Sequence, residues 1–496
     1  MDAMPLASVT YAIADWLFLR ALGVIYLAAF VSIGMQVKGL IGRDGILPAA
    51  IFLDDLKTVL GRARFAALPT LCWFGTSDRF LQCLCWGGAA LSVALIAGIA
   101  PVITLALLWA SYLSLLNVCR VFLAYQWDVL LLETGFLAVW LAPVELLPHW
   151  PPRADPHPIA LWLARWLLFR LMFSSAVVKL RSGDPTWRAL TALTYHYETQ
   201  PLPTPLAWLA HHLPPWFHQM SCALMFVIEL PVPFLMLASP PVSYIAGVLT
   251  IALMLLVMAT GNYCFFNLLA IALSLLLFDD AVWRHVLPAG ATVSSRWPWW
   301  ALVPMAFVLL VLSVRRVVYL FGRDVSWPRS LERLFAWLEP FHLVSGYGLF
   351  AVMTTTRPEI IVEGSDDGAT WKPYEFKWKP DDPTRPPRYC MPHQPRLDWQ
   401  MWFAALGDYR RYPWFIAFLA RLLEDARPVL SLLRTNPFPA APPRYVRATV
   451  YRYQFSDFAT RRATGEWWRR ERLGLYCPVL TRSTEAGTNA RSSRSA

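Results

Sequence analysis

Residues 242–260 read Val-Ser-Tyr-Ile-Ala-Gly-Val-Leu-Thr-Ile-Ala-Leu-Met-Leu-Leu-Val-Met-Ala-Thr and decide the fold class, because they contain no charged side chain. A helix that crosses a membrane needs about 20 mostly apolar residues. Eight further stretches are also mostly apolar: 16–36, 81–100, 102–119, 129–147, 159–178, 217–238, 264–278 and 299–321. The stretch 264–278 is short, and 65–75 is a candidate re-entrant piece. The sequence therefore predicts an all-α polytopic membrane bundle of about eight to ten spans over residues 1–325.

The composition supports a membrane protein. Hydrophobic residues make up 57% and charged residues 16% of the 496 residues, against about 45–50% and about 25% in soluble domains. The net charge of +11 is typical of loops beside an anionic bilayer. No zinc-finger, RRM or recognition-helix pattern accompanies it, so the lipid bilayer is the expected partner and nucleic acid is not.

The chain changes character after Phe321. An amphipathic connector is predicted over 326–342, and alternating apolar and polar residues at 347–353, 359–363, 371–378 and 445–455 predict strands. A helix is expected between residues 399 and 433. We therefore predict a β-rich, β-sandwich-like C-terminal domain with helical insertions over 343–480. The Ser-, Arg- and Thr-rich stretch 481–496 is predicted to be disordered.

The eight cysteines contain no Cys-x-x-Cys motif, and six lie in apolar stretches, where buried free thiols are expected. Only Cys390 and Cys477 fall in the polar tail, and a disulfide between them stays open. The histidines match no zinc signature, so no metal is predicted. We also predict no removable signal peptide, because the N-terminus lacks a basic n-region.

Five polar residues fall within or next to the predicted spans: Glu133, Arg170, Glu229, Asn262 and Asn267. A charge at mid-membrane costs at least about 2.5–3.5 kcal/mol, so the charged members need partners or water. Two interpretations remain for them, a functional site and inter-helix ion pairs. The two asparagines either cap a span or line a binding site.

The loop after Val178 is dense in groups that titrate. Lys179, His196 and Glu198 form a candidate catalytic set, because a histidine beside a partly desolvated lysine can transfer protons. The alternative is a solvated basic loop. No nucleophile elbow, P-loop or dinucleotide fingerprint is present, so the catalytic signature is incomplete and no cofactor is predicted.

Five strings of sequence carry a resemblance to a known family. They are Leu131-Leu-Glu-Thr-Gly-Phe-Leu-Ala, Phe169-Arg-Leu-Met-Phe-Ser-Ser-Ala-Val-Val-Lys-Leu-Arg-Ser-Gly-Asp-Pro-Thr-Trp, Tyr195-His-Tyr-Glu-Thr-Gln-Pro, Gly261-Asn-Tyr-Cys-Phe-Phe-Asn and Gly346-Tyr-Gly-Leu-Phe-Ala-Val-Met. From about residue 16 to about residue 478 the chain resembles the lipase maturation factor family.

The resemblance implies a multi-pass protein that helps secreted lipases fold and assemble into active dimers. In animals it implies the endoplasmic reticulum membrane, and for a bacterial member the inner or plasma membrane. A lipase-like client protein is the implied partner. The client-binding part is implied to be about 343–478, with Arg385, Gln394, Asp398 and Trp399 in it. The face that carries this domain stays open, because the basic loop 37–80 favours the cytoplasm and secretion favours the opposite face.

A fainter similarity favours an enzyme instead. Val178-Lys179-Leu180 with Asp184 and Trp187 is similar to the segment of vitamin K-dependent carboxylase whose lysine is the catalytic base. The hydropathy also resembles that of quinone-linked membrane oxidoreductases. The alternative function is thus a membrane enzyme that acts around Lys179 and His196.

Overall fold

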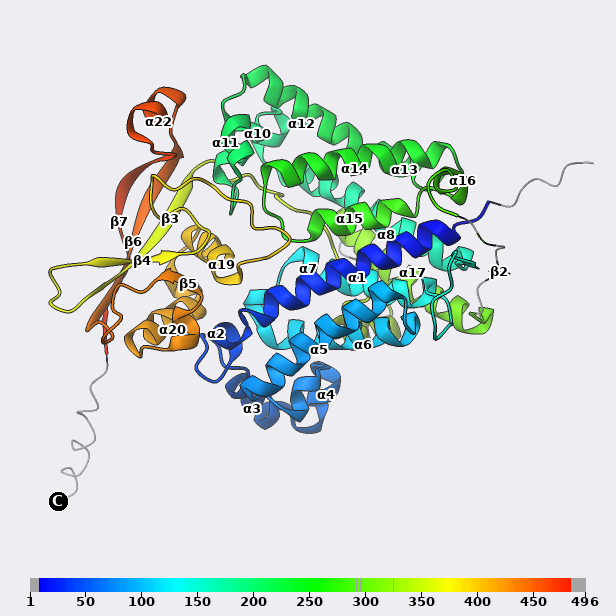
Figure 1. Cartoon of the computed structure of the whole chain (residues 1–496), viewed down its shortest axis with the longest axis horizontal. Coiled ribbons are helices and arrows are strands. Elements are labelled where there is room, and N and C mark those ends of the chain that lie inside the picture. Colours follow the sequence, from blue (N-terminus) through cyan, green and yellow to red (C-terminus); the bar gives the residue numbers. More distant parts are fainter. Residues whose placement is uncertain (1–8, 289, 291–292, 295–296, 324, 483–496) are drawn as a thin grey trace, which may run out of the picture.

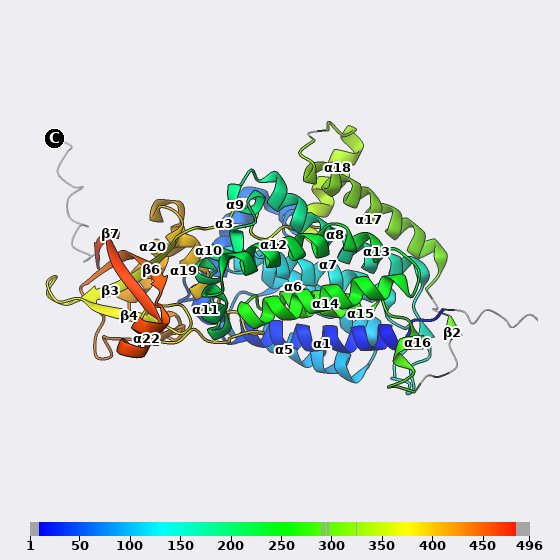
Figure 2. The ribbon, with the colours of Figure 1, turned by 90° about the horizontal axis from the view of Figure 1, so that it is seen from above.

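A computed structural model describes residues 9–288, 290, 293–294, 297–323 and 325–482. Long helices run side by side in a bundle, and a five-stranded sheet with its own helices lies at one end of it (Figures 1 and 2). The first described residues, which precede α1, lie at the opposite end of the bundle (Figure 1). The predicted class, a helical membrane bundle followed by a β-rich domain with helical insertions, is confirmed.

Seven segments in the described ranges are long and apolar enough to cross a membrane. They contain α1 (Ala12–Gly34), α5 (Asp78–Ala97), α6 (Pro101–Cys119), α8 (Pro158–Arg181), α12 (Pro215–Glu229) with α13 (Val232–Leu235), α14 (Val242–Thr260) and α17 (Trp299–Leu320). The other two expected spans form shorter helices, α7 (Gln126–Leu141) and α15 (Phe266–Leu275). α7 ends early because Pro143 disfavours helical backbone at Ala142, which is extended.

The two long loops fold into short helices near the end of the bundle that carries the sheet (Figure 1). The first loop contains α2 (Val37–Ile41), α3 (Ala49–Leu60), η1 (Gly61–Ala63), α4 (Arg64–Ala67) and η2 (Leu71–Phe74). The second contains α9 (Pro185–Arg188), α10 (Ala192–Thr199) and α11 (Pro205–His211). Smaller elements are η3 (Arg120–Leu123), α16 (Asp280–Trp283) and the parallel pair β1 (Ala154–Asp155) and β2 (Val293–Ser294). The candidate re-entrant piece 65–75 forms α4 and η2 in this loop.

The amphipathic connector forms α18 (Arg329–Leu338) and η4 (Glu339–Phe341), after which the chain enters the bundle as irregular backbone. Phe341 stacks on Trp109 of α6 at a centroid distance of 6.3 Å, and Tyr347 donates to Glu133, halfway along α7. The strand predicted at 347–353 is therefore wrong. Its alternation arises because the residues contact helices on several sides, and irregular backbone is tolerated at this depth because protein surrounds it.

The C-terminal domain contains one antiparallel sheet in the order β5-β4-β3-β6-β7. Its strands are β3 (Arg357–Ser365), β4 (Lys372–Phe376), β5 (Leu433–Thr435), β6 (Tyr445–Phe455) and β7 (Trp468–Thr481). Its helices are α19 (Arg396–Ala405), α20 (Pro413–Leu423), α21 (Arg427–Leu430) and α22 (Phe458–Thr464), with η5 (Tyr409–Arg411). The predicted strands at 359–363, 371–378 and 445–455 are confirmed as β3, β4 and β6.

The described residues of this domain show no second facing sheet, so the β-sandwich is corrected to a single sheet covered by helices. α20 supplies the opposing layer, since Phe418 packs on Phe376 and Phe415 packs on Tyr476. One hydrophobic cluster runs from α1 through the bundle into β6. Cys390 and Cys477 are both buried and free, so the disulfide left open by the sequence is not formed. The predicted disordered stretch lies outside the described residues from 483 onward.

Candidate functional site

The sheet domain meets the bundle through a buried polar joint that the sequence did not reveal. Arg396, the first residue of α19, donates to both carboxylate oxygens of Asp128 on α7 at 2.6 and 2.8 Å and to Phe122 O at 3.1 Å. Both members of the pair are fully buried. Tyr112 adds a 2.6 Å hydrogen bond to Asp128. A desolvated pair with these extra hydrogen bonds fixes orientation more than it adds stability.

Gln394 and Trp399, two predicted client-binding residues, belong to this joint. Gln394 Oε1 accepts from Trp127 Nε1 at 2.7 Å, and its backbone N–H donates to Ser32 Oγ at 3.0 Å. Trp399 packs edge-to-face against Trp127 at 5.0 Å and against Tyr125 at 5.6 Å. Both residues are buried. They therefore hold the domain on α1 and α7 and offer no free surface.

Asp398, the third predicted residue, is also buried. Its Oδ1 accepts from the backbone N–H groups of Trp378 and Lys379 at 2.8 and 3.0 Å. Burial raises the pKa of this carboxyl to about 6, although these hydrogen bonds oppose the shift. Arg385, the fourth, lies at the sheet surface and pairs with Glu375 at 2.6 Å. The four predicted residues thus form no single patch.

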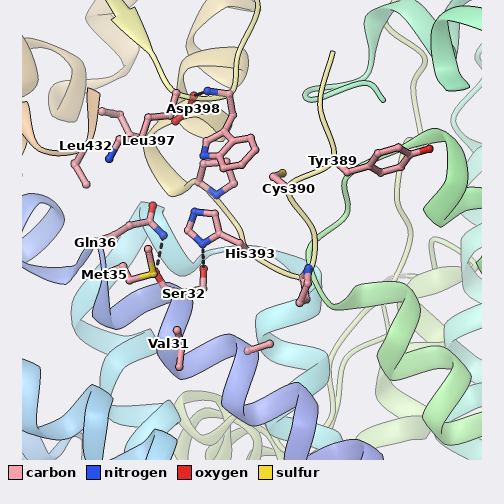
Figure 3. Close-up of a pocket in the computed structure, with 15 residues that line it drawn as sticks. Val31, Ser32, Met35, Gln36, Tyr389, Cys390, His393, Leu397, Asp398 and Leu432 are labelled. Atoms are coloured by element: carbon pink, nitrogen blue, oxygen red, sulfur yellow. Dashed lines mark hydrogen bonds between the residues drawn. The ribbon is translucent and has the colours of Figure 1, made fainter. Parts of the chain in front are cut away.

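A cleft of about 440 Å³ lies beside the joint, between the end of α1 and the loops of the sheet domain. Figure 3 shows its wall: Ser32 and His393 point toward each other from the two domains, with Gln36 and Asp398 nearby. Ser32 Oγ and His393 Nδ1 are 2.9 Å apart. Burial lowers the pKa of His393 to about 4, as do Arg396 and Lys377, so the ring is neutral at pH 7.

Asn262 and Arg357 extend the joint from opposite sides. Asn262 donates to Arg388 O at 2.8 Å and accepts from Cys390 N–H at 2.8 Å. These two hydrogen bonds bind it to a loop of the sheet domain. Arg357, fully buried on β3, donates to the carbonyls of Glu198, Gln200 and Pro201 at 2.7, 2.5 and 2.9 Å. Neither role could be found without knowing which segments meet.

The structure does not bring the three candidate catalytic residues, Lys179, His196 and Glu198, together in one site. Lys179 Nζ donates to both carboxylate oxygens of Glu229 at 2.9 and 2.7 Å, and His196 lines the same cavity as this pair. Glu198 instead accepts from the backbone N–H of Phe455 at 2.7 Å and faces His211. Lys179 and His196 therefore share a site, and Glu198 belongs to the contact with β6.

The remaining intramembrane polar residues are paired. Arg170 on α8 bonds to Glu133 on α7, and Glu133 Oε2 also accepts from Ser345 N–H at 2.9 Å and from the Tyr347 hydroxyl at 2.6 Å. Asn267 donates to Met254 O at 3.1 Å and links α15 to α14. These contacts follow the ion-pair interpretation, with backbone groups supplying the additional partners.

No three His, Cys, Asp or Glu side chains within the described ranges are grouped so that they could hold a metal ion. The joint positions one whole domain on another, whereas the cavity has the size and mixed lining of a small-molecule site.

Comparison with known proteins matches both parts of the chain. Residues 13–285 match the lipase maturation factor transmembrane domain, and residues 343–478 match the lipase maturation factor C-terminal domain. Human lipase maturation factor 2 is 36% identical, over 94% of this chain and 82% of that protein. Human lipase maturation factor 1 is 36% identical, over 95% and 88%, and the bovine protein of the same name is 36% identical, over 96% and 91%. No solved structure matches the chain.

The Lys179–Glu229 and Arg170–Glu133 pairs of the bundle fall in the first matched region, and the joint connects the two regions, with Asp128 in the first and Arg396 in the second. The described fold has both parts, a multi-pass bundle and a sheet domain docked on it. From this correspondence over nearly its full length, the chain belongs to the lipase maturation factor family.

Proposed function

We propose that this integral membrane protein assists the maturation of secreted lipases by holding a client on its C-terminal domain. The observation that carries the proposal is the match to lipase maturation factors over 94–96% of the chain. The buried joint supports it, because a client bound to the sheet domain would be kept at a fixed distance from the bilayer. The proposed outcome is a client folded and assembled into its active dimer.

The free edge of β7 is the surface we assign to the client. β7 has 14 residues and, within the part of the chain that the structure describes, pairs only with β6 and ends the sheet. An edge strand presents unpaired backbone N–H and C=O groups, to which an extended segment of another chain can add as a strand. The side chains of Leu473 and Leu475 are exposed on this strand, beside its register shifts, and offer apolar contacts.

The charges around this edge select the kind of segment. Arg469, Arg470 and Arg472 are exposed on β7, so an extended client segment with apolar and acidic side chains is favoured. Gln394, Asp398 and Trp399 are then positioning residues, because they are buried at or beside the joint. Of the residues implied by the resemblance, Arg385 alone has a partly exposed side chain that a client could touch.

The proposal assigns the compartment as well. We place the sheet domain on the lumenal face of the endoplasmic reticulum in a eukaryotic source, or on the periplasmic face of the inner membrane in a bacterial one. The start of α1 would then face the cytoplasm, since it lies at the opposite end of the bundle from the sheet domain (Figure 1).

Co-isolation of a co-expressed secreted lipase with the full-length protein tests the client surface. The double variant Leu473→Lys/Leu475→Lys adds charge to the edge, and we expect it to reduce recovered lipase by about tenfold, which is about 1.4 kcal/mol. Leu406→Lys is the matched control, because Leu406 is 44% exposed in the same domain but lies after α19. Equal recovery with the edge variant and the control would contradict the assignment.

The alternative, an enzyme at Lys179 and His196, is less well supported. Glu229 holds Lys179 through both carboxylate oxygens, so the amine already has a partner within the bundle. The pairing favours a structural role for Lys179, which the Lys179→Arg variant described below tests.

A further inference from the structure

A cavity of about 360 Å³ lies between α8, α12 and α14 in the half of the bundle nearer the sheet domain, and α10 covers it. Its walls are mostly apolar: Met172, Leu193, Phe217, Ile228, Leu253 and Phe350 all contribute. This volume is within the range of about 300–1,000 Å³ that small-molecule sites occupy. The cavity is separate from the joint and from the edge of β7, and it has no part in the proposed function.

The mouth of the cavity faces the membrane. Leu224 on α12 and Leu256 on α14 line the cavity, yet they are 53% and 64% exposed on the outside of two candidate spans. The medium around these helices is hydrocarbon, so the molecules that reach the mouth are lipids. An occupant must therefore be soluble in the bilayer, and the apolar walls suit an alkyl chain.

A chain of hydrogen bonds fixes the polarity of one wall. Gln200 Nε2 donates to the carbonyls of Tyr197 and Thr260 at 3.2 and 2.8 Å, so its Oε1 is the acceptor for the Tyr263 hydroxyl at 2.8 Å. Since Tyr263 gives its proton to Gln200, its oxygen accepts from His196 Nε2–H at 3.1 Å. A neutral imidazole that donates from Nε2 is an acceptor at Nδ1.

His196 is neutral at pH 7, because burial and the nearby Lys179 lower its pKa to about 4. Its Nδ1 has no hydrogen-bond partner among the described residues. His196 Nδ1 can therefore accept a hydrogen bond from a bound molecule, and a hydroxyl group is a suitable donor.

The Lys179–Glu229 pair fixes the polarity of the other wall. Nζ donates to both carboxylate oxygens of Glu229, and its other neighbours are Met225 Sδ at 3.8 Å and the Trp187 ring, whose centroid is 5.3 Å away. Because sulfur is a weak acceptor, Lys179 has a donor left for a carbonyl oxygen. The two charges sum to zero, so a charged headgroup would enter this apolar site without compensation.

We propose that this cavity binds a neutral glycerolipid, a monoacylglycerol or diacylglycerol, with its free hydroxyl donating to His196 Nδ1 and an ester carbonyl accepting from Lys179 Nζ. The acyl chain fills the apolar part and leaves through the mouth between α12 and α14. A phospholipid brings a charge that nothing in the site balances. A quinone has carbonyl acceptors but no hydroxyl for His196, so it satisfies only one wall.

The test uses full-length protein in phosphatidylcholine nanodiscs and a diacylglycerol whose acyl chain carries a diazirine. We expect saturable labelling of peptides from α8, α12 and α14, and we expect unlabelled dioleoylglycerol to compete for it. A probe with the same acyl chain on a methyl ester, which has no hydroxyl, should label about tenfold less. Equal labelling by the two probes, or stronger competition by a ubiquinone than by dioleoylglycerol, would overturn the proposal.

Adjacent residues of α14 provide a matched pair of variants. Leu256→Trp fills the mouth and should abolish labelling, whereas Leu255→Trp should not, because Leu255 is 52% exposed but does not line the cavity. Both positions face lipid, so both variants should fold. His196→Phe keeps the ring and removes the acceptor, and we expect about a tenfold loss of labelling. Loss of labelling in Leu255→Trp as well, or full labelling in Leu256→Trp, would place the lipid elsewhere.

Discussion

The guanidinium of Arg396 and the carboxylate of Asp128 face each other across the two domains at 2.6 and 2.8 Å, with no exposed side-chain surface. They are separated by 268 residues in the chain. Each partner alone would be an uncompensated buried charge. The docking of the sheet domain on α7 therefore depends on both being present.

Removal of one partner of this pair should strongly destabilise the protein. We expect Arg396→Met to lower the free energy of unfolding by about 3–5 kcal/mol, because Asp128 would be left buried without its partner. The double variant Asp128→Leu/Arg396→Met should recover most of the loss. Unfolding of the three proteins in mixed micelles, followed by tryptophan fluorescence, measures both values. A double variant no more stable than Arg396→Met would contradict this role of the pair.

Replacement of Lys179 distinguishes structure from catalysis. Lys179→Arg keeps a cation beside Glu229 and should leave both membrane abundance and lipase maturation close to normal. Lys179→Met leaves Glu229 unpaired and should reduce abundance, which Lys179→Met/Glu229→Gln should restore. Immunoblots of membranes beside the activity of a co-expressed lipase provide the readout. Normal abundance with no maturation in Lys179→Arg would favour the enzyme.

Asp398 should make stability fall as pH rises. Its pKa is about 6 in the folded protein and about 3.9 when unfolded, so the folded state holds the proton more tightly between these values. Its contribution is present below about pH 4 and is lost as the pH rises to about 6, at roughly 1.4 kcal/mol per unit. The stability of Asp398→Asn relative to wild type should therefore rise by about 2 kcal/mol from pH 4 to pH 6, out of about 3 kcal/mol for the whole titration. A difference that is flat with pH would contradict this assignment.

The C-terminal domain is proposed as a folding unit of its own, over about residues 343–480. Excised, it should show β-type circular dichroism and a cooperative melt, because β3 and β6 pair along their whole lengths within it. Its melting temperature should lie below that of the full protein, since Arg396 and Trp399 lose their partners on α7. A disordered spectrum would mean that the bundle is required for its fold.

The sequence was sufficient to predict the elements whose signal is local. Apolar stretches such as 242–260 predicted the long helices. The alternation of apolar and polar residues predicted β3, β4 and β6. β7 was missed because Arg469-Arg470-Glu471-Arg472, Gly474 and Pro478 hide its pattern. Charges and proline are what a free edge strand carries, so the residues that conceal this strand are the ones expected at the end of a sheet.

The contacts between distant segments could not be predicted. Glu133, Arg170 and Glu229 were identified as needing partners, but Ser345 and Tyr347, which complete the site of Glu133, lie more than 200 residues away in irregular backbone. Asp398 and Trp399 entered through the family resemblance alone. Their positions at or beside the joint follow from tertiary packing, which no local pattern of residues encodes.

The central claim, that this protein matures lipases through its anchored sheet domain, is tested most directly by one measurement. It is the specific activity of a dimeric lipase secreted from cells that lack their own maturation factor, with and without this chain. We predict that the wild-type protein raises activity per mass of secreted lipase at least about tenfold, and that Leu473→Lys/Leu475→Lys, present at equal abundance, does not. Unchanged specific activity with the wild-type protein correctly inserted in the membrane would contradict the claim.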